Sequence, residues 1–296
     1  MATVFYDKVA VKVTVGSESE VLLASDCSVN YTTAQQPIYS IGNKGPLGQF
    51  PAAARAGDMS FNFLTSITGQ HFGGAGNIIN GLASGIKGST DSIGSGVKLE
   101  FAGVSGVGFL NSYGFNVASN SISTSNAAFT LFGEGTSLPV SGRLSGSLYS
   151  PLVEQTALST GIAHGRYTTL PSQLITTVSA KSAGADDVGT VFGADYSISF
   201  NHNPIYKVGQ EFPTTTFYTT ASESVNVTED VFNSGLAFDQ PNISSVNIDL
   251  AGLDPAGAPI AQKMQVGISN MKQVSTSMSA GLDSIVRTQK TLTAAY

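Results

Sequence analysis

The sequence predicts a mainly β protein of the α+β class, with two tandem β modules that each carry a flanking helix. Three observations predict it. The 296 residues include 33 glycines but only 11% charged residues, against about 25% in an average domain. Apolar residues alternate with polar ones along many short runs, and one stretch of fourteen residues occurs twice. Two further segments have apolar residues at helical spacing. We place the boundary near Ser150–Pro151, which gives modules 1–150 and 151–296.

The duplicated stretch runs from Pro37 to Phe50 and again from Pro204 to Phe217, an offset of 167 residues with six identities. Proline ends a strand ladder and glycine permits a tight turn, so we expect a loop between two strands in each copy. The residues that shape these loops are Pro37, Tyr39, Gly42 and Pro46 in the first copy and Pro204, Tyr206, Gly209 and Pro213 in the second. The flanks also align. Asp26–Tyr31 matches Asp195–Phe200 if two residues are dropped from the following turn, and Met59–Phe63 matches the alternation of Ser224–Val227. Shaping a loop is the main role that the residue types indicate.

In the first module, strict alternation predicts strands at 9–15, 21–31, 59–63 and 97–101. Cys27 alternates with Val29 and Tyr31, which predicts a small core residue. It is the only cysteine, so no disulfide and no thiolate metal site is expected. Residues 109–133 read as a long hairpin that could reach a neighbouring subunit.

Residues 73–95 are predicted to contain the first helix. Ile79, Ile86 and Ile93 recur every seven residues, and Leu82 lies on the same face. Gly81 and other glycines weaken this helix by about 1 kcal/mol each, so it requires tertiary packing.

In the second module, strands are expected at 173–180, 196–200, 225–227 and 246–250, followed by a long helix over 260–288. Met264, Met271, Met278 and Ile285 recur every seven residues. This narrow stripe suits either another subunit or the chain's own sheet, and the pattern does not decide between them. The candidate subunit interface comprises Met264, Ile268, Met271, Met278, Leu282 and Ile285.

The charge pattern argues against a nucleic-acid-binding protein, because the net charge is −6 and no basic run occurs. So few charges predict a surface that other subunits largely cover. The N-terminus lacks a signal-peptide pattern, and no apolar run is long enough to span a membrane.

Residues that could carry catalysis do not form a recognisable pattern. His71, His164 and His202 have no second ligand at zinc spacing, and no phosphate loop or nucleophile motif occurs. We therefore expect no enzyme, no metal and no cofactor.

Two stretches resemble a known family. The motif Pro-Ile-Tyr-x-x-Gly at Pro37 and Pro204, and the hairpin of residues 109–133, are similar to those of tail tube proteins of long-tailed bacteriophages. The similarity covers about 80 residues of the first module and fewer of the second, where the 109–133 hairpin has no visible counterpart.

This resemblance implies a virion structural protein made in a host cytoplasm and located in the phage tail. Its tube-type β-sandwich modules would assemble into rings, either a trimer with pseudo-sixfold symmetry or a hexamer. Their inner sheets would merge into a barrel through which DNA passes, and other tail proteins would be partners. The protein could form the tube or a tube-like piece of the baseplate or neck. The alternatives are a β-rich receptor-binding or capsid-decoration protein and, less favoured by the residues, a hydrolase.

Overall fold

The structure is a computed structural model that describes residues 9–51, 56–65, 70–72, 74–88, 96–118, 123–133, 138–142, 174–181, 191–210, 212–230, 242–253, 259–280 and 286–295. The predicted boundary at Ser150–Pro151 lies outside these residues.

The first half contains eleven described strands and one helix. They are β1 Val9–Val15, β2 Glu18–Thr32, β3 Gln35–Tyr39, β4 Pro46–Pro51, β5 Ala56–Leu64, β6 Gln70–His71, β7 Gly74–Ala75, α1 Ile78–Gly88, β8 Val97–Phe101, β9 Val104–Ala118, β10 Thr124–Leu131 and β11 Val140–Gly142. The described strands of the second half are β12 Leu174–Lys181, β13 Val191–Ile205, β14 Thr215–Asp230, β15 Asn242–Leu253, β16 Pro259–Ser279 and β17 Arg287–Ala295. The mainly β part of the prediction is therefore correct.

Thirteen of the strands form a single antiparallel sheet in the order β10-β5-β2-β1-β8-β9-β13-β14-β17-β16-β15-β12, with β11 on β9. Strand β9 also pairs with β10, so the six strands of the first half close on themselves. Strand β9 then pairs with β13, and this joint links the two halves into one sheet.

The two halves share a strand order. The first half contributes β2-β5-β10-β9, and the second half contributes β13-β14-β17-β16. The registers match as well, because Asp26 pairs with Asn62 as Asp195 pairs with Asn226. The β16–β17 hairpin thus occupies the place of the β9–β10 hairpin, which the sequence comparison of the halves missed.

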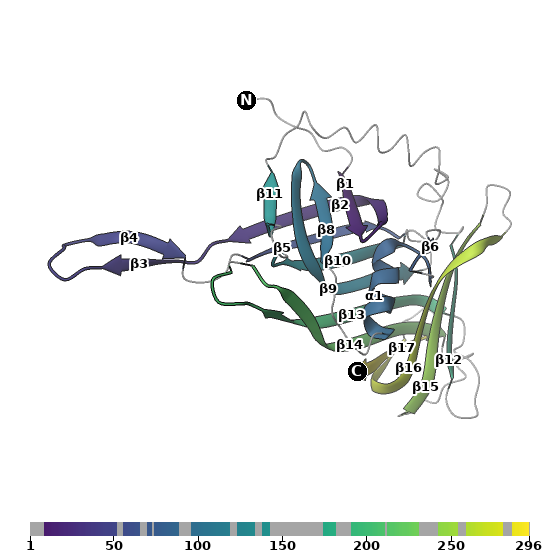
Figure 1. The fold of residues 1–296 in the computed structure, drawn as a ribbon. Coiled ribbons are helices and arrows are strands. Elements are labelled where there is room, and N and C mark those ends of the chain that lie inside the picture. The colour runs from purple at the N-terminus through teal and green to yellow at the C-terminus, as the bar shows by residue number, and fades with distance from the viewer. Residues whose placement is uncertain are drawn as a thin grey trace.

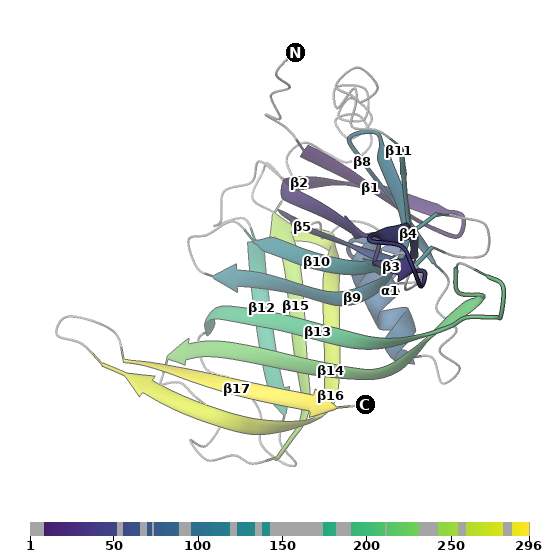
Figure 2. The ribbon, with the colours of Figure 1, turned by 90° about the vertical axis from the view of Figure 1, so that its left-hand side faces the viewer.

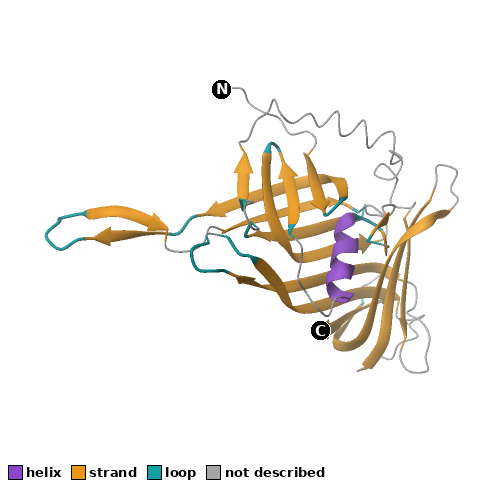
Figure 3. Ribbon diagram, viewed as in Figure 1, coloured by secondary structure: helices purple, strands orange, loops and turns teal. Residues whose placement is uncertain are grey.

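Strands β2, β5, β10, β9, β13, β14 and β17 lie side by side in one layer, and β12, β15 and β16 cross behind it (Figure 2). Helix α1 lies between these layers (Figures 1 and 3). The core is aromatic and continues across the joint, where the Tyr196 ring of β13 lies 5.1 Å from Phe115 and 6.3 Å from Tyr113 of β9. Burying such rings is the main stabilising term of the fold.

The helix predicted over 73–95 is present as α1, residues 78–88. Asn77 caps it, since its side-chain oxygen accepts the backbone N–H of Asn80 at 2.9 Å. Gly81 is required by packing, because a Cβ there would lie 2.8 Å from the carbonyl oxygen of His71. The glycine that weakens the helix therefore lets it approach the preceding hairpin.

The long C-terminal helix over 260–288 is wrong, and so is the α+β class with a helix in each module. Residues 259–279 form β16, a 21-residue strand, and residues 287–295 form β17. Alternation along β16 is interrupted at Asn270, which has a φ of +57°, and at a register shift between Gln273 and Ser275. Each interruption shifts the alternation by one residue. Residues seven apart, which an even strand would place on opposite faces, therefore share a face and imitate a helical stripe.

Candidate functional site: a polar face on a continuous sheet

One row of paired residues crosses eight strands, from β2 to β16. From one edge to the other it consists of Asp26, Asn62, Asn126, Gly114, Ser197, Ser224, Thr293 and Lys272. No apolar side chain occurs in this row, although the flanking positions on the same strands form the core. The seven strands of this layer, together with residues 272–279 of β16 that pair with β17, therefore have one buried apolar face and one polar face.

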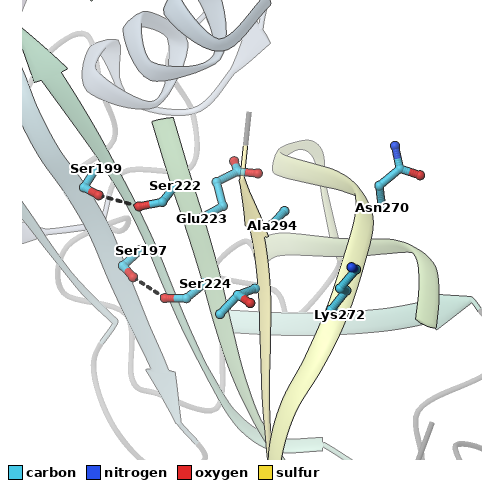
Figure 4. A pocket seen from close by; sticks show the side chains of 9 residues that line it. Ser197, Ser199, Ser222, Glu223, Ser224, Asn270, Lys272 and Ala294 are labelled. Atoms are coloured by element: carbon cyan, nitrogen blue, oxygen red, sulfur yellow. Dashed lines mark hydrogen bonds between the residues drawn. The ribbon is translucent and has the colours of Figure 1, made fainter. Parts of the chain in front are cut away.

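Short polar side chains on this polar face bond to each other across the strands. Three serine pairs join neighbouring strands, and Figure 4 shows two of them. The oxygen–oxygen distances are 2.8 Å for Ser28–Ser60, 2.6 Å for Ser197–Ser224 and 2.8 Å for Ser199–Ser222. Asn62 donates to both carboxylate oxygens of Asp26, at 3.1 and 2.9 Å. These pairs hold the side chains of the polar face against the sheet.

The charges of the polar face are acidic over most of its width. Asp26, Asp58 and Asp195 are exposed on it. No lysine or arginine occurs on β2 beyond residue 24, on β5, on β10, on β9 beyond residue 111, or on β13 and β14. The described cations of this layer, Lys272, Arg287 and Lys290, belong to the last two strands, and Lys290 points into the core.

The polar face is hollowed near β16. This hollow has a volume of about 600 Å³. It is lined by the serines of β13 and β14 together with Glu223, Asn270, Lys272 and Ala294 (Figure 4), and also by Thr293. It is wide and open, so we read it as curvature of the polar face.

Two ion pairs, one partly buried and one fully buried, support the sheet from behind. The ammonium group of Lys87 on α1 lies 2.9 Å from both carboxylate oxygens of Glu223 on β14. Glu223 also accepts the hydroxyl of Tyr196 at 2.8 Å. On the neighbouring strands, Lys290 lies 2.5 Å from Glu229, and both side chains are buried. The first pair ties the helix to the sheet, and the second joins β14 to β17.

A histidine between two carboxylates anchors the segment before α1. His71 Nδ1 lies 2.9 Å from Glu18, and Nε2 lies 3.2 Å from Glu20. Glu20 is buried and also accepts the backbone N–H of Ile78 at 2.6 Å. The two carboxylates raise the pKa of His71, although burial opposes them.

The predicted loop residues lie at two arms. Pro37 and Tyr39 are on β3, Pro46 is on β4, and Gly42 is in the turn of this β3–β4 arm, which projects far from the body (Figure 1). In the second arm, Pro204 lies in β13 and pairs with Thr216, and the loop from β13 to β14 contains Tyr206, Gly209 and Pro213.

Both arms carry the same turn. The Asn43 amide donates to Ser40 at 3.2 Å, as the Gln210 amide donates to Lys207 at 3.0 Å. Gly42 and Gly209 have φ of +94° and +83°, which glycine adopts at little cost. Ile41 and Val208, each just before the glycine, are fully exposed.

The predicted interface residues do not form one surface. Met264, Ile268 and Met271 are buried within the chain, whereas Met278 has 59% of its surface exposed. Leu282 and Ile285 lie outside the described residues. Of the six candidates, Met278 alone is both described and exposed.

No group of three histidine, cysteine or acidic residues among the described positions could hold a metal ion. Cys27 is half-buried and its surroundings raise the pKa of its thiol to about 12, mainly by desolvation. Neither feature points to catalysis. In the part of the chain that the structure describes, no helix is long and apolar enough to cross a membrane.

Comparison with known proteins gives no assignment: no family model matches this chain, and no curated protein matches it.

The polar face itself was missed by sequence reasoning. Its signal is present in the alternating small polar residues Asp26-Ser28-Asn30, Ser60-Asn62, Ser197-Ser199 and Ser222-Ser224-Asn226. Their partners depend on strand order, which the sequence alone did not supply.

Proposed function

We propose that this protein is a virion structural subunit whose copies assemble into rings of a phage tail tube, or of a tube-like baseplate or neck piece, around a channel for DNA. It acts by assembly rather than by catalysis. The observation that carries the proposal is the polar face, which continues from one half of the chain to the other across eight strands.

The chemistry of the polar face suits a channel wall. DNA carries a dense row of phosphates and binds tightly where lysine and arginine replace its counterions. Serine, asparagine and aspartate offer no such contact, and the carboxylates repel phosphate. DNA can therefore pass along this face without being held.

The open ends of the sheet also support assembly. An open sheet with a buried back and a polar front exposes strand edges that invite pairing with another chain. Closing several copies into a ring removes these edges. The exposed aliphatic residues of the arms, Ile41 and Val208, indicate further contacts between subunits.

Negative-stain electron microscopy of the purified full chain tests this proposal. We expect rings or short tubes with a central hole of about the width of duplex DNA. Discrete monomers, or isolated trimers without a hole that bind host cells, would contradict it and favour the receptor-binding or decoration alternative.

A further inference from the structure

We propose that the open edge of β16 in one copy pairs with the open edge of β2 in the next copy, in the register that β9 and β13 use within one chain. The inference rests on the ring function proposed above and names the strands that form the contact between subunits.

Both edges are visible in the pairing pattern. Strand β2 pairs with β1 only through residues 18–24, so residues 25–32 are open on that side. Strand β16 pairs with β15 through residues 259–272, and no described strand pairs with residues 274–279 on that side. Among the described strands, only β5 pairs with the segment of β2 and only β17 with the segment of β16, each on the opposite side. The two segments are similar in length and carry backbone groups that a neighbouring strand can satisfy.

The directions of the two edges are compatible. The row from β2 to β16 contains eight strands, counting both of these, and every neighbouring pair in it is antiparallel. Because this number is even, β2 and β16 run in opposite directions. Pairing β16 with β2 of the next copy therefore continues the antiparallel order without interruption.

The chain already makes one such joint between its own halves. Strand β9 pairs with β10 on one side, and on the other side with β8 and then β13. Strand β16 pairs with β17 on one side, and on the other side with β15 and then with no strand that the structure describes. Because β16 corresponds to β9 in the repeat, the strand expected beside the open part of β16 is the equivalent of β13. The equivalent of β13 in the first half is β2. The next copy's β2 is therefore the strand that the internal repeat predicts there.

The internal joint also gives the register. Asn116 lies opposite Asp195, and Gly114 lies opposite Ser197. Asp195 and Ser197 correspond to Asp26 and Ser28, because in each half the aspartate pairs with an asparagine and the serine with a serine on the next strand.

The partners on β16 follow from the same comparison. In the first half, Asn62 pairs with Asn126, and Asn126 pairs with Gly114. In the second half, the equivalent residue Asn226 pairs with Thr291, and Thr291 pairs with Ser275. Ser275 therefore corresponds to Gly114. Two residues further along, Ser277 takes the place of Asn116. We therefore expect Ser28 of one copy opposite Ser275 of the next, and Asp26 opposite Ser277.

The side chains at the two edges match this arrangement. On the polar face, Ser28 would meet Ser275 and extend the series of serine pairs within the chain. On the opposite face, Tyr31 and Met278 are 40% and 59% exposed. Val29, two residues before Tyr31, packs against the core, and Thr288, opposite Met278, is buried. A neighbouring copy would cover the side chains of Tyr31 and Met278.

Cysteine cross-linking tests the register. In a Cys27→Ala background, the variant Ser28→Cys/Ser275→Cys is purified and oxidised, and its products are separated on a non-reducing gel. The matched control is Ser28→Cys/Ser279→Cys, whose second cysteine lies about 13 Å along the same strand, beyond the reach of a disulfide. We expect a reducible series of dimers and larger species, with at least about tenfold more product than in the control.

The outcomes separate this inference from the proposed function. Rings in the microscope without register-specific cross-linking, or with equal cross-linking of both variants, would overturn the inference and leave the ring function standing. Specific cross-linking into open chains without rings would support the strand pairing and contradict the ring. Rings together with specific cross-linking would support both.

Discussion

His71 shows how one residue can make the stability of this protein depend on pH. Both ring nitrogens contact carboxylates, which can only accept hydrogen bonds, so the protonated ring satisfies both contacts and the neutral ring loses one. The pKa of His71 is raised in the folded chain. Its stabilising contribution is therefore complete below the unfolded value of about 6.5 and is lost as the pH rises through the folded pKa.

We predict that the wild type loses stability relative to His71→Gln as the pH rises above about 6.5. The measurement is the denaturant midpoint of both proteins at several pH values in this range. His202 has a lowered pKa because of burial, but it is present in both proteins, so its effect cancels. Cys27, with a pKa of about 12, titrates only well above neutral pH. Parallel pH profiles for the two proteins would show that the carboxylate contacts of His71 do not matter.

Strand β16 offers a pair of methionines that separates core from interface. Met271 is 1% exposed and Met278 is 59% exposed on the same strand. We predict that Met271→Asp, which buries an unpaired charge, destabilises the chain by more than about 4 kcal/mol and prevents folding. Met278→Asp should cost less than about 1 kcal/mol but weaken assembly.

Circular dichroism and size-exclusion chromatography of the two variants check this difference. A folded Met271→Asp protein would mean that its side chain is exposed in solution. A Met278→Asp protein that assembles like the wild type would place the subunit contact elsewhere.

The local elements of this fold could largely be predicted, but their partners could not. Alternation located the strands around Cys27, Phe61 and Leu99, and the repeat aligned Ser28 with Ser197 and Ser60 with Ser224. In the structure these residues pair as Ser28–Ser60 and Ser197–Ser224. The pairing of β9 with β13 joins residues about 80 positions apart, and no local pattern encodes such a choice.

The main error has a local cause. Asn270 in a left-handed conformation and the irregularity after Gln273 each interrupt the alternation of β16. A strand with two such interruptions can place residues seven apart on one face, and this spacing predicted the helix. The polar row could have been read only after the strand order was known.

The charge distribution of the whole molecule leads to a prediction about DNA. If the polar face lets DNA pass, the wild type should not retain duplex DNA at physiological salt. We predict that the triple variant Asp26→Lys/Asp58→Lys/Asp195→Lys binds duplex DNA. The logarithm of its binding constant should fall linearly with the logarithm of the salt concentration, with a slope on the order of −2 to −3. Fluorescence anisotropy with labelled duplex DNA over a salt series measures this slope.

The matched control replaces the same three aspartates with asparagine, which removes the negative charge but adds no cation. We expect this control to bind far more weakly than the lysine variant. Salt-sensitive DNA binding by the wild type would show that the cations near β16 and β17 dominate, and the polar face would then be a poor channel lining.

The lengths of the strand ladders also determine where a closed wall would fail under load. Hydrogen bonds between antiparallel strands run perpendicular to the strands, so in a ring they follow the circumference. Internal pressure would stretch all ladders in series, and the shortest ladder would break first. The joint between β9 and β13 has seven paired positions, and so do the ladders between β9 and β10 and between β16 and β17, whereas the ladder from β13 to β14 has fourteen. Rupture is therefore expected at one of these three short ladders, and β13 and β14 would stay together.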